Sequence, residues 1–287
     1  MGMATKPAPK PGAKAAQFPA SRQRWGGGSS SLAPQTLRPQ TPVRLAAQDQ
    51  QVVRTPSGLG LDSALVRQRM VERLRTWGID DPRVLQAFAL VPRHQFVDSA
   101  LVTQAYEDTS LPIGHGQTIS KPLVIARMLS LAAAPRQTVS NAEAVASRPL
   151  GKVLEIGTGC GYQAALLSVL GRSVFSIERI RALHDKARLH LNETGITDVR
   201  LIWGDGYAGH PPNAPYDTIV SAAGGSELPQ AWLAQLALGG VLVAPVESPA
   251  HGGQVLMRYE KTATGWQQSL HDGVEFVPLK SGLLGQH

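Results

Sequence analysis

A short segment with three glycines constrains the fold of this chain more than any other part of the sequence. Val153, Leu154 and Ile156 form a short apolar run of strand character, and glycines follow at positions 157, 159 and 161. From Gln163 onwards apolar residues return at helical spacing, so the segment predicts a strand, a glycine turn and a helix. Glycines at such a junction let the backbone turn sharply and let a ligand approach closer than a Cβ atom would permit.

Acidic residues lie where a nucleoside site requires them. Glu178 ends a second apolar run, twenty-one residues after Gly157. A carboxylate at this spacing suits hydrogen bonds to both hydroxyls of a ribose. A third apolar run is followed by an acid between two glycines, which suits adenine recognition: Gly204, Asp205 and Gly206. The sequence therefore predicts a nucleoside-cofactor site at the carboxyl edge of a parallel sheet.

The spacing of the glycines separates two classes of cofactor. Dinucleotide-binding proteins use G-x-G-x-x-G, whose third glycine allows close packing beside a pyrophosphate. In this chain that third position is Tyr162, a bulky residue, and the last glycine comes one residue earlier. The E-x-G-x-G-x-G pattern resembles motif I of the class I S-adenosylmethionine methyltransferases. The cofactor-binding residues expected from this motif and the two acids are Glu155, Gly157, Thr158, Gly159, Gly161, Glu178, Asp205 and Gly206.

Composition limits the class of protein. With 287 residues, of which 43% are hydrophobic, the chain can bury a sizeable core. Cys160 is the single cysteine, which excludes an internal disulfide and fits a reducing compartment. No apolar run approaches the roughly 20 residues that span a bilayer, and the N-terminus lacks the apolar core of a signal peptide. No spacing of His, Cys and Asp suggests a metal site. We therefore expect a cytoplasmic protein without a membrane segment or a metal.

Residues 1–60 differ in character from the rest of the chain. They hold eight Lys or Arg against one acid, Asp49, and so carry the whole net charge of +7. They also contain eight prolines, a glycine-serine run at 26–31 and almost no periodic apolar pattern. Such a segment cannot bury enough surface to offset its ordering entropy, so we expect a disordered basic tail. A solvated extension without function and weak, salt-sensitive adhesion to nucleic acid or acidic partners are both open.

The folded part begins near Leu61, and residues 61–131 predict three helices, at 65–77, 81–88 and 121–131. In the first, apolar residues recur at helical intervals with charged residues between them, as an amphipathic helix requires. The second and third have a proline in the first turn, a position that favours it.

A polar segment separates the second and third of these helices. Residues 111–120 fit neither the strand nor the helix period, yet they are rich in hydroxyls, amides and glycines, which is typical of loops that carry function. Ser120 precedes the third helix, so its hydroxyl can alternatively serve as the N-cap. Residues 132–150 are rich in alanine and serine without a clear pattern and predict an inserted loop.

Strands and helices alternate after residue 151. The expected strands are 153–156, 174–177, 199–203, 216–221 and 241–246, and the expected helices are one from Gln163, 182–191 and 232–236. Repeated βα units predict a doubly wound, mostly parallel sheet. Residues 254–260, 265–270 and 274–278 read as antiparallel strands that finish it. The fold class is therefore α/β and Rossmann-like, with N-terminal helices and an antiparallel C-terminal region, in a domain of residues 61–287.

Four segments together resemble one family. They are V-P-R at 91–93 with F-V at 96–97, A-Y-E-D at 105–108, I-G-H-G-Q-T-I-S at 113–120 and S-I-E-R at 176–179. In this order they closely resemble the protein-L-isoaspartate O-methyltransferases, and the resemblance covers about residues 61–280. It implies a class I methyltransferase fold with its last strands ordered unusually. It also implies methyl transfer from S-adenosylmethionine to the free α-carboxylate of L-isoaspartyl residues. The tail and the 132–150 loop are long for the family, and Cys160 stands where serine is common.

The chemistry of such a transfer fits the residues. A peptide carboxylate has a pKa of about 4 and is ionised at pH 7, so no general base is required. Positioning of the reactants can supply roughly 7–11 kcal/mol. We expect Ser120 to hold the acceptor carboxylate, and the small residues after the fourth strand to leave room for the substrate backbone. The expected substrate-binding residues are Gln117, Thr118, Ile119, Ala222 and Ala223.

The sequence leaves two alternative functions open. A related methyltransferase could act on a small molecule or a nucleic acid, but S-A-A-G-G at 221–225 stands where amino-group methyltransferases often have Asn-Pro-Pro-Tyr. A catalytically silent scaffold could bind protein through its tail. The expected partners are isoaspartyl proteins and peptides, with nucleic acid at most weakly through the tail, and we expect a monomer.

Overall fold

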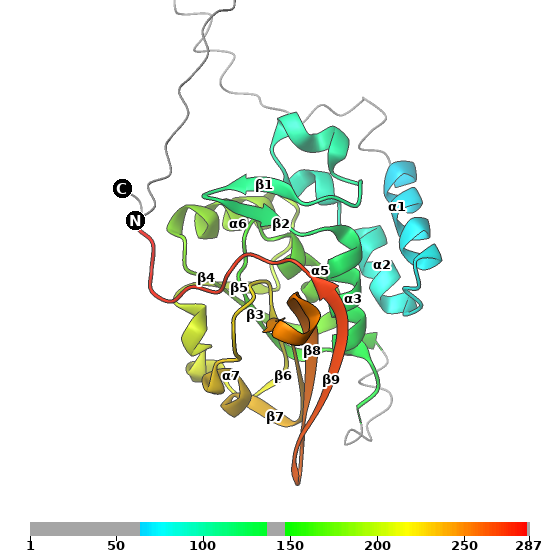
Figure 1. The fold of residues 1–287 in the computed structure, drawn as a ribbon. Helices are drawn as coiled ribbons and strands as arrows, with labels where there is room; N and C mark the ends of the chain where they lie inside the picture. The colour runs from blue at the N-terminus through cyan, green and yellow to red at the C-terminus, as the bar shows by residue number, and fades with distance from the viewer. Residues whose placement is uncertain (1–63, 137–146, 286–287) are drawn as a thin grey trace, which may run out of the picture. The chain divides into compact units, whose positions relative to one another are not determined.

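The structure is a computed structural model that describes residues 64–136 and 147–285. The predicted tail at 1–60 and most of the predicted loop at 132–150 lie outside these residues. Figure 1 shows the described part as a twisted sheet with helices packed on it.

One seven-stranded sheet, with the order β5-β4-β3-β6-β7-β8-β9, organises the domain. Its strands are β3 (Gly151–Ile156), β4 (Gly171–Glu178), β5 (Val199–Trp203), β6 (Tyr216–Ser221), β7 (Leu236–Ser248), β8 (Gly253–Thr262) and β9 (Gly265–Val274). The pairs from β5 to β7 are parallel, and β8 and β9 pair antiparallel. The mostly parallel sheet is confirmed, and β7, β8 and β9 lie side by side in chain order.

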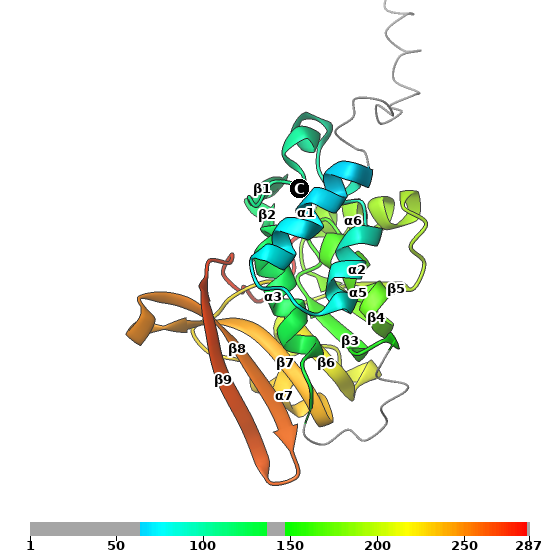
Figure 2. The same ribbon diagram turned by 90° about the vertical axis from the view of Figure 1, so that its right-hand side faces the viewer.

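Helices cover both faces of this sheet. They are α1 (Ala64–Thr76), α2 (Pro82–Leu90), α3 (Pro122–Ala133), α5 (Tyr162–Leu170), α6 (Arg181–Glu193) and α7 (Gln230–Ala234). Successive residues of a strand point to opposite faces, so Val153 packs into the core with α1, α2, α3 and α5, whereas Leu154 packs into a second core with Trp232 of α7. Figure 2 shows α1, α2 and α3 together on the first face.

Short 3-10 helices connect these elements. They are Arg93–Phe96, Ser99–Gln104, Gly206–Ala208, Pro211–Asn213 and Pro249–His251. The expected start of α2 is confirmed, because the Asp81 side chain accepts a hydrogen bond from the backbone nitrogen of Arg83 and Pro82 occupies the first turn.

The polar segment at 111–120 is a β-hairpin, so the expectation that it contains no strand was wrong. β1 (Leu111–Gly114) and β2 (Gln117–Ile119) pair antiparallel. Leu111, Ile113 and Ile119 are buried, and most of the residues between them are exposed. Strands of three and four residues are too short for a period of two to stand out in the sequence.

The last expected strand, at 274–278, is also absent from the described residues. β9 ends at Val274, and the chain then makes only isolated bridges, between Gly224 and Pro278 and between Ile180 and Leu284. Residues 277–284, called the 277–284 segment below, are the red trace that runs from β9 back towards β4 in Figure 1.

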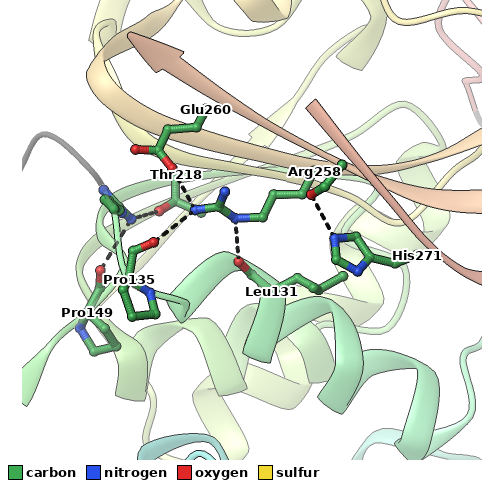
Figure 3. A network of polar contacts seen from close by, with 9 residues as sticks. Leu131, Pro135, Pro149, Thr218, Arg258, Glu260 and His271 are labelled. Atoms are coloured by element: carbon green, nitrogen blue, oxygen red, sulfur yellow. Dashed lines mark hydrogen bonds and ion pairs between the residues drawn. The ribbon is translucent and has the colours of Figure 1, made fainter. Parts of the chain in front are cut away.

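Two arginines anchor the far end of α3 to the sheet, as Figure 3 shows for Arg258. Arg258 donates to the carbonyl of Leu131 (3.0 Å) and to the buried carboxylate of Glu260 (2.9 Å). Arg136, just after α3, donates to the hydroxyl of Thr218 (2.7 Å). Because α3 begins two residues after Ser120, these contacts support the segment that carries this serine.

Candidate active site

A cavity lies at the carboxyl ends of the parallel strands. Residues from the glycine loop, the β1–β2 hairpin, the end of β4 and the 277–284 segment line it. It brings together most of the predicted site residues: Gln117, Thr118, Ile119, Ser120, Gly157, Thr158, Gly159, Glu178, Gly206, Ala222 and Ala223. The carboxyl edge of a doubly wound sheet is where ligands bind in such folds.

The glycine loop leaves its backbone open to the cavity. Gly159 has a φ of +57°, in the left-handed region, and a Cβ atom there would lie 3.1 Å from Cδ1 of Ile113. A side chain at this position would therefore fill the space between the loop and the hairpin. The loop fits a ligand that needs close backbone contact, as S-adenosylmethionine does.

Glu178 is held at the cavity wall by backbone hydrogen bonds. Its Oε2 accepts from the nitrogen of Gly159 (2.9 Å) and its Oε1 from the nitrogen of Ile180 (2.8 Å). Burial raises the pKa of this carboxyl, although the two amide hydrogen bonds oppose the shift. Each carboxylate oxygen can accept a second hydrogen bond, so Glu178 can still bind the two hydroxyls of a ribose.

Glu155 does not line the cavity, although the motif predicted a cofactor contact. It is fully buried, and the hydroxyl of Ser176 donates to its Oε2. The Ser176 hydroxyl is also hydrogen-bonded to that of Thr158, which does line the cavity. Burial raises the pKa of Glu155 to about 8. Its effect on a ligand therefore passes through Ser176 and Thr158.

Gly161 also lies away from the cavity. It has a φ of +94° at the start of α5, and a Cβ atom there would lie 3.3 Å from the Cβ of Ala187. The structure gives this glycine a packing role, because it allows α5 and α6 to approach closely, and its contact with a cofactor stays a prediction.

Asp205 lies beside the lining residue Gly206 but is not itself part of the lining. Its Oδ1 accepts from the nitrogen of Tyr207 (2.9 Å) and its Oδ2 from the nitrogen of Gly282 (2.7 Å). A contact between Asp205 and an adenine stays a prediction. The contact that the structure describes is with the 277–284 segment.

Ser120 lies where the cavity meets a second, wider groove. Ser120, Thr118 and Val277 line both. The rest of the groove comes from Ser110, Lys121, Val124, His251, Gly253, Gln254 and residues 273–276. Within the described part of the chain, the Ser120 hydroxyl has no hydrogen-bond partner.

The alternative role of Ser120 as a helix cap is not found. The N-cap of α3 is Lys121, and its side chain makes no capping hydrogen bond. Instead, the carboxylate of Asp108 accepts from the nitrogen of Leu123 (2.9 Å) in the first turn. The Ser120 hydroxyl is therefore available to a ligand.

Sequence reasoning missed the contribution of the 277–284 segment, whose residues 277–280 line the cavity. The segment is anchored at Gly224, which donates to the carbonyl of Val277 (2.9 Å) and accepts from the nitrogen of Leu279 (2.6 Å). At its other end the nitrogen of Leu284 donates to the carbonyl of Arg179 (2.9 Å). These are backbone contacts between residues far apart in the sequence, and no motif or spacing predicts them.

In residues 64–136 and 147–285, no group of three or more His, Cys, Asp or Glu side chains could hold a metal ion. No helix of the same residues is long and apolar enough to cross a membrane.

Comparisons with known proteins agree with this geometry. The family model of protein-L-isoaspartate(D-aspartate) O-methyltransferase matches residues 65–284. A protein-L-isoaspartate O-methyltransferase from Methylibium petroleiphilum is 55% identical over 256 residues, which cover 89% of this chain and 91% of the relative.

Solved structures give the same result at lower identity. A protein-L-isoaspartate O-methyltransferase structure is 28% identical and has a TM-score of 0.63, over 76% of this chain and 67% of the other. A Plasmodium falciparum protein, assigned to the same type and solved with S-adenosyl-L-homocysteine, is 24% identical with a TM-score of 0.62, over 75% and 98% of the two chains. The second likeness supports the fold alone.

Proposed function

This chain belongs to the protein-L-isoaspartate O-methyltransferase family, and we propose that its cavity binds S-adenosylmethionine while Ser120 holds the acceptor carboxylate at the border with the groove. The enzyme transfers a methyl group from S-adenosylmethionine to the free α-carboxylate of L-isoaspartyl residues in damaged proteins. The methyl ester then collapses to a succinimide without the enzyme and reopens partly to normal aspartate, which starts the repair.

The reaction needs alignment rather than acid–base catalysis. S-adenosylmethionine supplies an electrophilic methyl group on a sulfonium sulfur. The acceptor carboxylate, with a pKa of about 4, is already the nucleophile at pH 7, so no side chain has to remove a proton. A carboxylate oxygen forms the new bond as the bond from the methyl carbon to sulfur breaks, and a neutral thioether leaves. The cavity residues bind and orient the reactants and exclude water.

The cofactor side of the site has a role for each lining group. The Glu178 carboxylate accepts from the ribose hydroxyls, and the backbone of Gly157 and Gly159 lies against the amino-acid end. Thr158 is held in place by the buried pair of Ser176 and Glu155.

The acceptor side is built around the hairpin. The single observation that carries this proposal is that Ser120, whose hydroxyl has no hydrogen-bond partner among the described residues, lies where the cavity and the groove meet. Gln117, Thr118 and Ile119 of β2 form the wall beside it. Ala222 and Ala223 leave room for the substrate backbone opposite.

The test is the substitution Ser120→Ala. Loss of a hydrogen bond to a charged group lowers kcat/KM for an isoaspartyl peptide by about 10- to 100-fold. Calorimetry with S-adenosylhomocysteine should give an unchanged affinity. Ser168→Ala, whose hydroxyl bonds within α5, is the control and should keep full activity. If Ser120→Ala lost affinity for S-adenosylhomocysteine as strongly as it lost activity, the serine would have a structural role in the site and would not hold the acceptor.

The acceptor class is tested with paired peptides that contain isoaspartate or aspartate at the same position. Labelled methyl transfer to the isoaspartyl peptide alone is expected. Transfer only to another acceptor would favour a related methyltransferase, and no transfer at all would favour a scaffold.

The setting of the enzyme is also a proposal. We propose a monomer in the cytoplasm, a reducing compartment that fits a chain whose single cysteine is buried and free. The basic residues of segment 1–60 would attach weakly to nucleic acid. Deletion of this segment should then abolish retention on immobilised nucleic acid at low salt.

A further inference from the structure

A buried cation lies directly behind Ser120. Arg93 has an exposed fraction of 0%. Its Nη2 donates to the backbone carbonyl of Ser120 (2.8 Å), and its Nε donates to the carbonyl of Ala105 (2.8 Å). Its guanidinium carbon lies 4.9 Å from the centre of the Tyr162 ring, and Tyr162 lines the cofactor cavity. Arg93 thus connects the two halves of the site without lining either.

The charge of Arg93 is only partly compensated. No salt bridge to Arg93 exists among the described residues, and its Nη1 is buried without a hydrogen bond. The carboxylate whose charge acts on it belongs to Asp108, which already accepts a hydrogen bond from the nitrogen of Leu123. Burial lowers the pKa of Arg93, but an arginine stays protonated in a protein at neutral pH. A buried charge without a salt bridge is costly, so its presence here calls for a reason.

The acceptor carboxylate supplies that reason. We propose that Arg93 is a positioning residue whose fixed positive charge behind Ser120 makes the acceptor site prefer a carboxylate over a neutral group of the same shape. This inference rests on the proposed function, because it places the acceptor at Ser120. A charge held in a water-poor site acts more strongly than in solvent and needs no reorganisation when the substrate arrives.

The hydrogen bonds and the charge of Arg93 can be separated by substitution. Arg93→Met removes both, and Arg93→Gln removes the charge but keeps an N–H donor. Arg93→Lys keeps the charge but loses the planar fork that donates to the carbonyls of Ala105, Thr109 and Ser120 at once.

The measurement is binding of two peptides to the complex of the enzyme with S-adenosylhomocysteine. One peptide carries L-isoaspartate, and the other carries L-isoasparagine, in which a neutral carboxamide replaces the α-carboxylate. The wild-type complex should prefer the first. The two neutral variants should lower this preference about tenfold, and Arg93→Lys should keep it while weakening both peptides alike.

A matched control is Arg73→Met, since Arg73 also donates to a backbone carbonyl, that of Tyr106 (2.5 Å). Its loss should leave the preference unchanged. Thermal melts identify any variant that does not fold. If only one of Arg93→Met and Arg93→Gln folds, that variant alone is enough to measure the preference. The proposal is overturned if the neutral variants lose the same affinity for both peptides. It is also overturned if Arg93→Lys loses the preference for the carboxylate peptide. A wild-type enzyme that does not methylate the isoaspartyl peptide would instead refute the proposed function.

Discussion

Three ionisable side chains around the cavity are nearly or fully buried: Glu155, Glu178 and Arg93. Among the described residues none of them is in a salt bridge. Each is held by backbone groups or by a hydroxyl, which fixes the direction of the side chain without supplying a counter-charge. Such groups cost free energy in the folded state, and they pre-organise the site for its ligands.

Glu155 should make the stability of the ligand-free enzyme depend on pH. Burial raises its folded pKa to about 8, from an ordinary value of 4.5. Between these values the folded chain holds a proton that the unfolded chain has released, so folding takes up a proton and becomes less favourable as pH rises. The free energy of unfolding should fall by up to about 1.4 kcal/mol per pH unit in this window. Glu155→Gln should remove this slope, as urea denaturation from pH 5 to 8 would measure.

The control for this experiment is Glu193→Gln, at an exposed position of α6. It should follow the wild-type slope. A constant difference between wild type and Glu155→Gln across the range would mean that Glu155 is ionised in the folded protein throughout.

The sequence could predict some of these residues but not all. Glu178 was predictable because a carboxylate after the second strand is a local pattern, measured from the glycine loop. Arg93 was visible only as part of a signature. Its contacts reach 12 and 27 residues along the chain, to Ala105 and Ser120, and such distances leave no local period.

At the scale of elements, the glycine motif was read correctly as a strand, a turn and a helix. Its three glycines nevertheless have different functions. Gly157 and Gly159 line the cavity, whereas Gly161 is pressed against Ala187 of α6. Spacing alone cannot distinguish a glycine that faces a ligand from one that faces a helix, because the partner helix comes later in the chain.

A matched pair of substitutions should separate the two kinds of glycine. Gly159→Ala and Gly161→Ala both place a Cβ atom at a positive φ, so each should cost about 1–2 kcal/mol of stability. Only Gly159→Ala should also lower the affinity for S-adenosylhomocysteine, because its Cβ enters the cavity beside Ile113. Calorimetry of the two folded variants checks this. Equal losses of affinity would show that the loop moves as one unit.

Short or irregular elements were the ones that sequence reasoning missed. The β1–β2 hairpin has too few residues for a period to emerge, and Pro112 lies within its first strand. The start of the 277–284 segment was expected to belong to an antiparallel strand at 274–278, because turn residues separate that run from the strands before it. Tertiary contacts, with Gly224 and with residues 179–181, determine its path instead.

At the scale of the whole domain, the site combines segments from almost the full described chain. The hairpin near residue 115, the parallel strands and the 277–284 segment meet at one edge of the sheet. Anchoring of α3 through Arg258 and Arg136 keeps the start of this helix, next to Ser120, in register with the sheet. The position of the acceptor therefore depends on contacts at the opposite end of α3.

The hydrogen bond that anchors the 277–284 segment to Asp205 should determine how long S-adenosylhomocysteine stays bound. In Asp205→Asn, the amide oxygen can still accept from Tyr207, but the amide nitrogen would face the N–H of Gly282. Loss of this hydrogen bond should speed the dissociation of S-adenosylhomocysteine about two- to tenfold, as a stopped-flow chase would record. Asp272→Asn, which breaks an ion pair with Arg127 beyond this segment, should leave the rate unchanged. No change in Asp205→Asn would show that the segment opens independently of this anchor.

The 277–284 segment encloses the cavity more than it encloses the groove, and this difference has a kinetic consequence. Residues 277–280 wall in the donor, whereas the groove shares only Val277 with them. The methylated polypeptide can depart while the backbone hydrogen bonds of the 277–284 segment remain intact, but S-adenosylhomocysteine cannot. The catalytic cycle should accordingly follow a compulsory sequence, in which the small molecule is first to enter and last to leave.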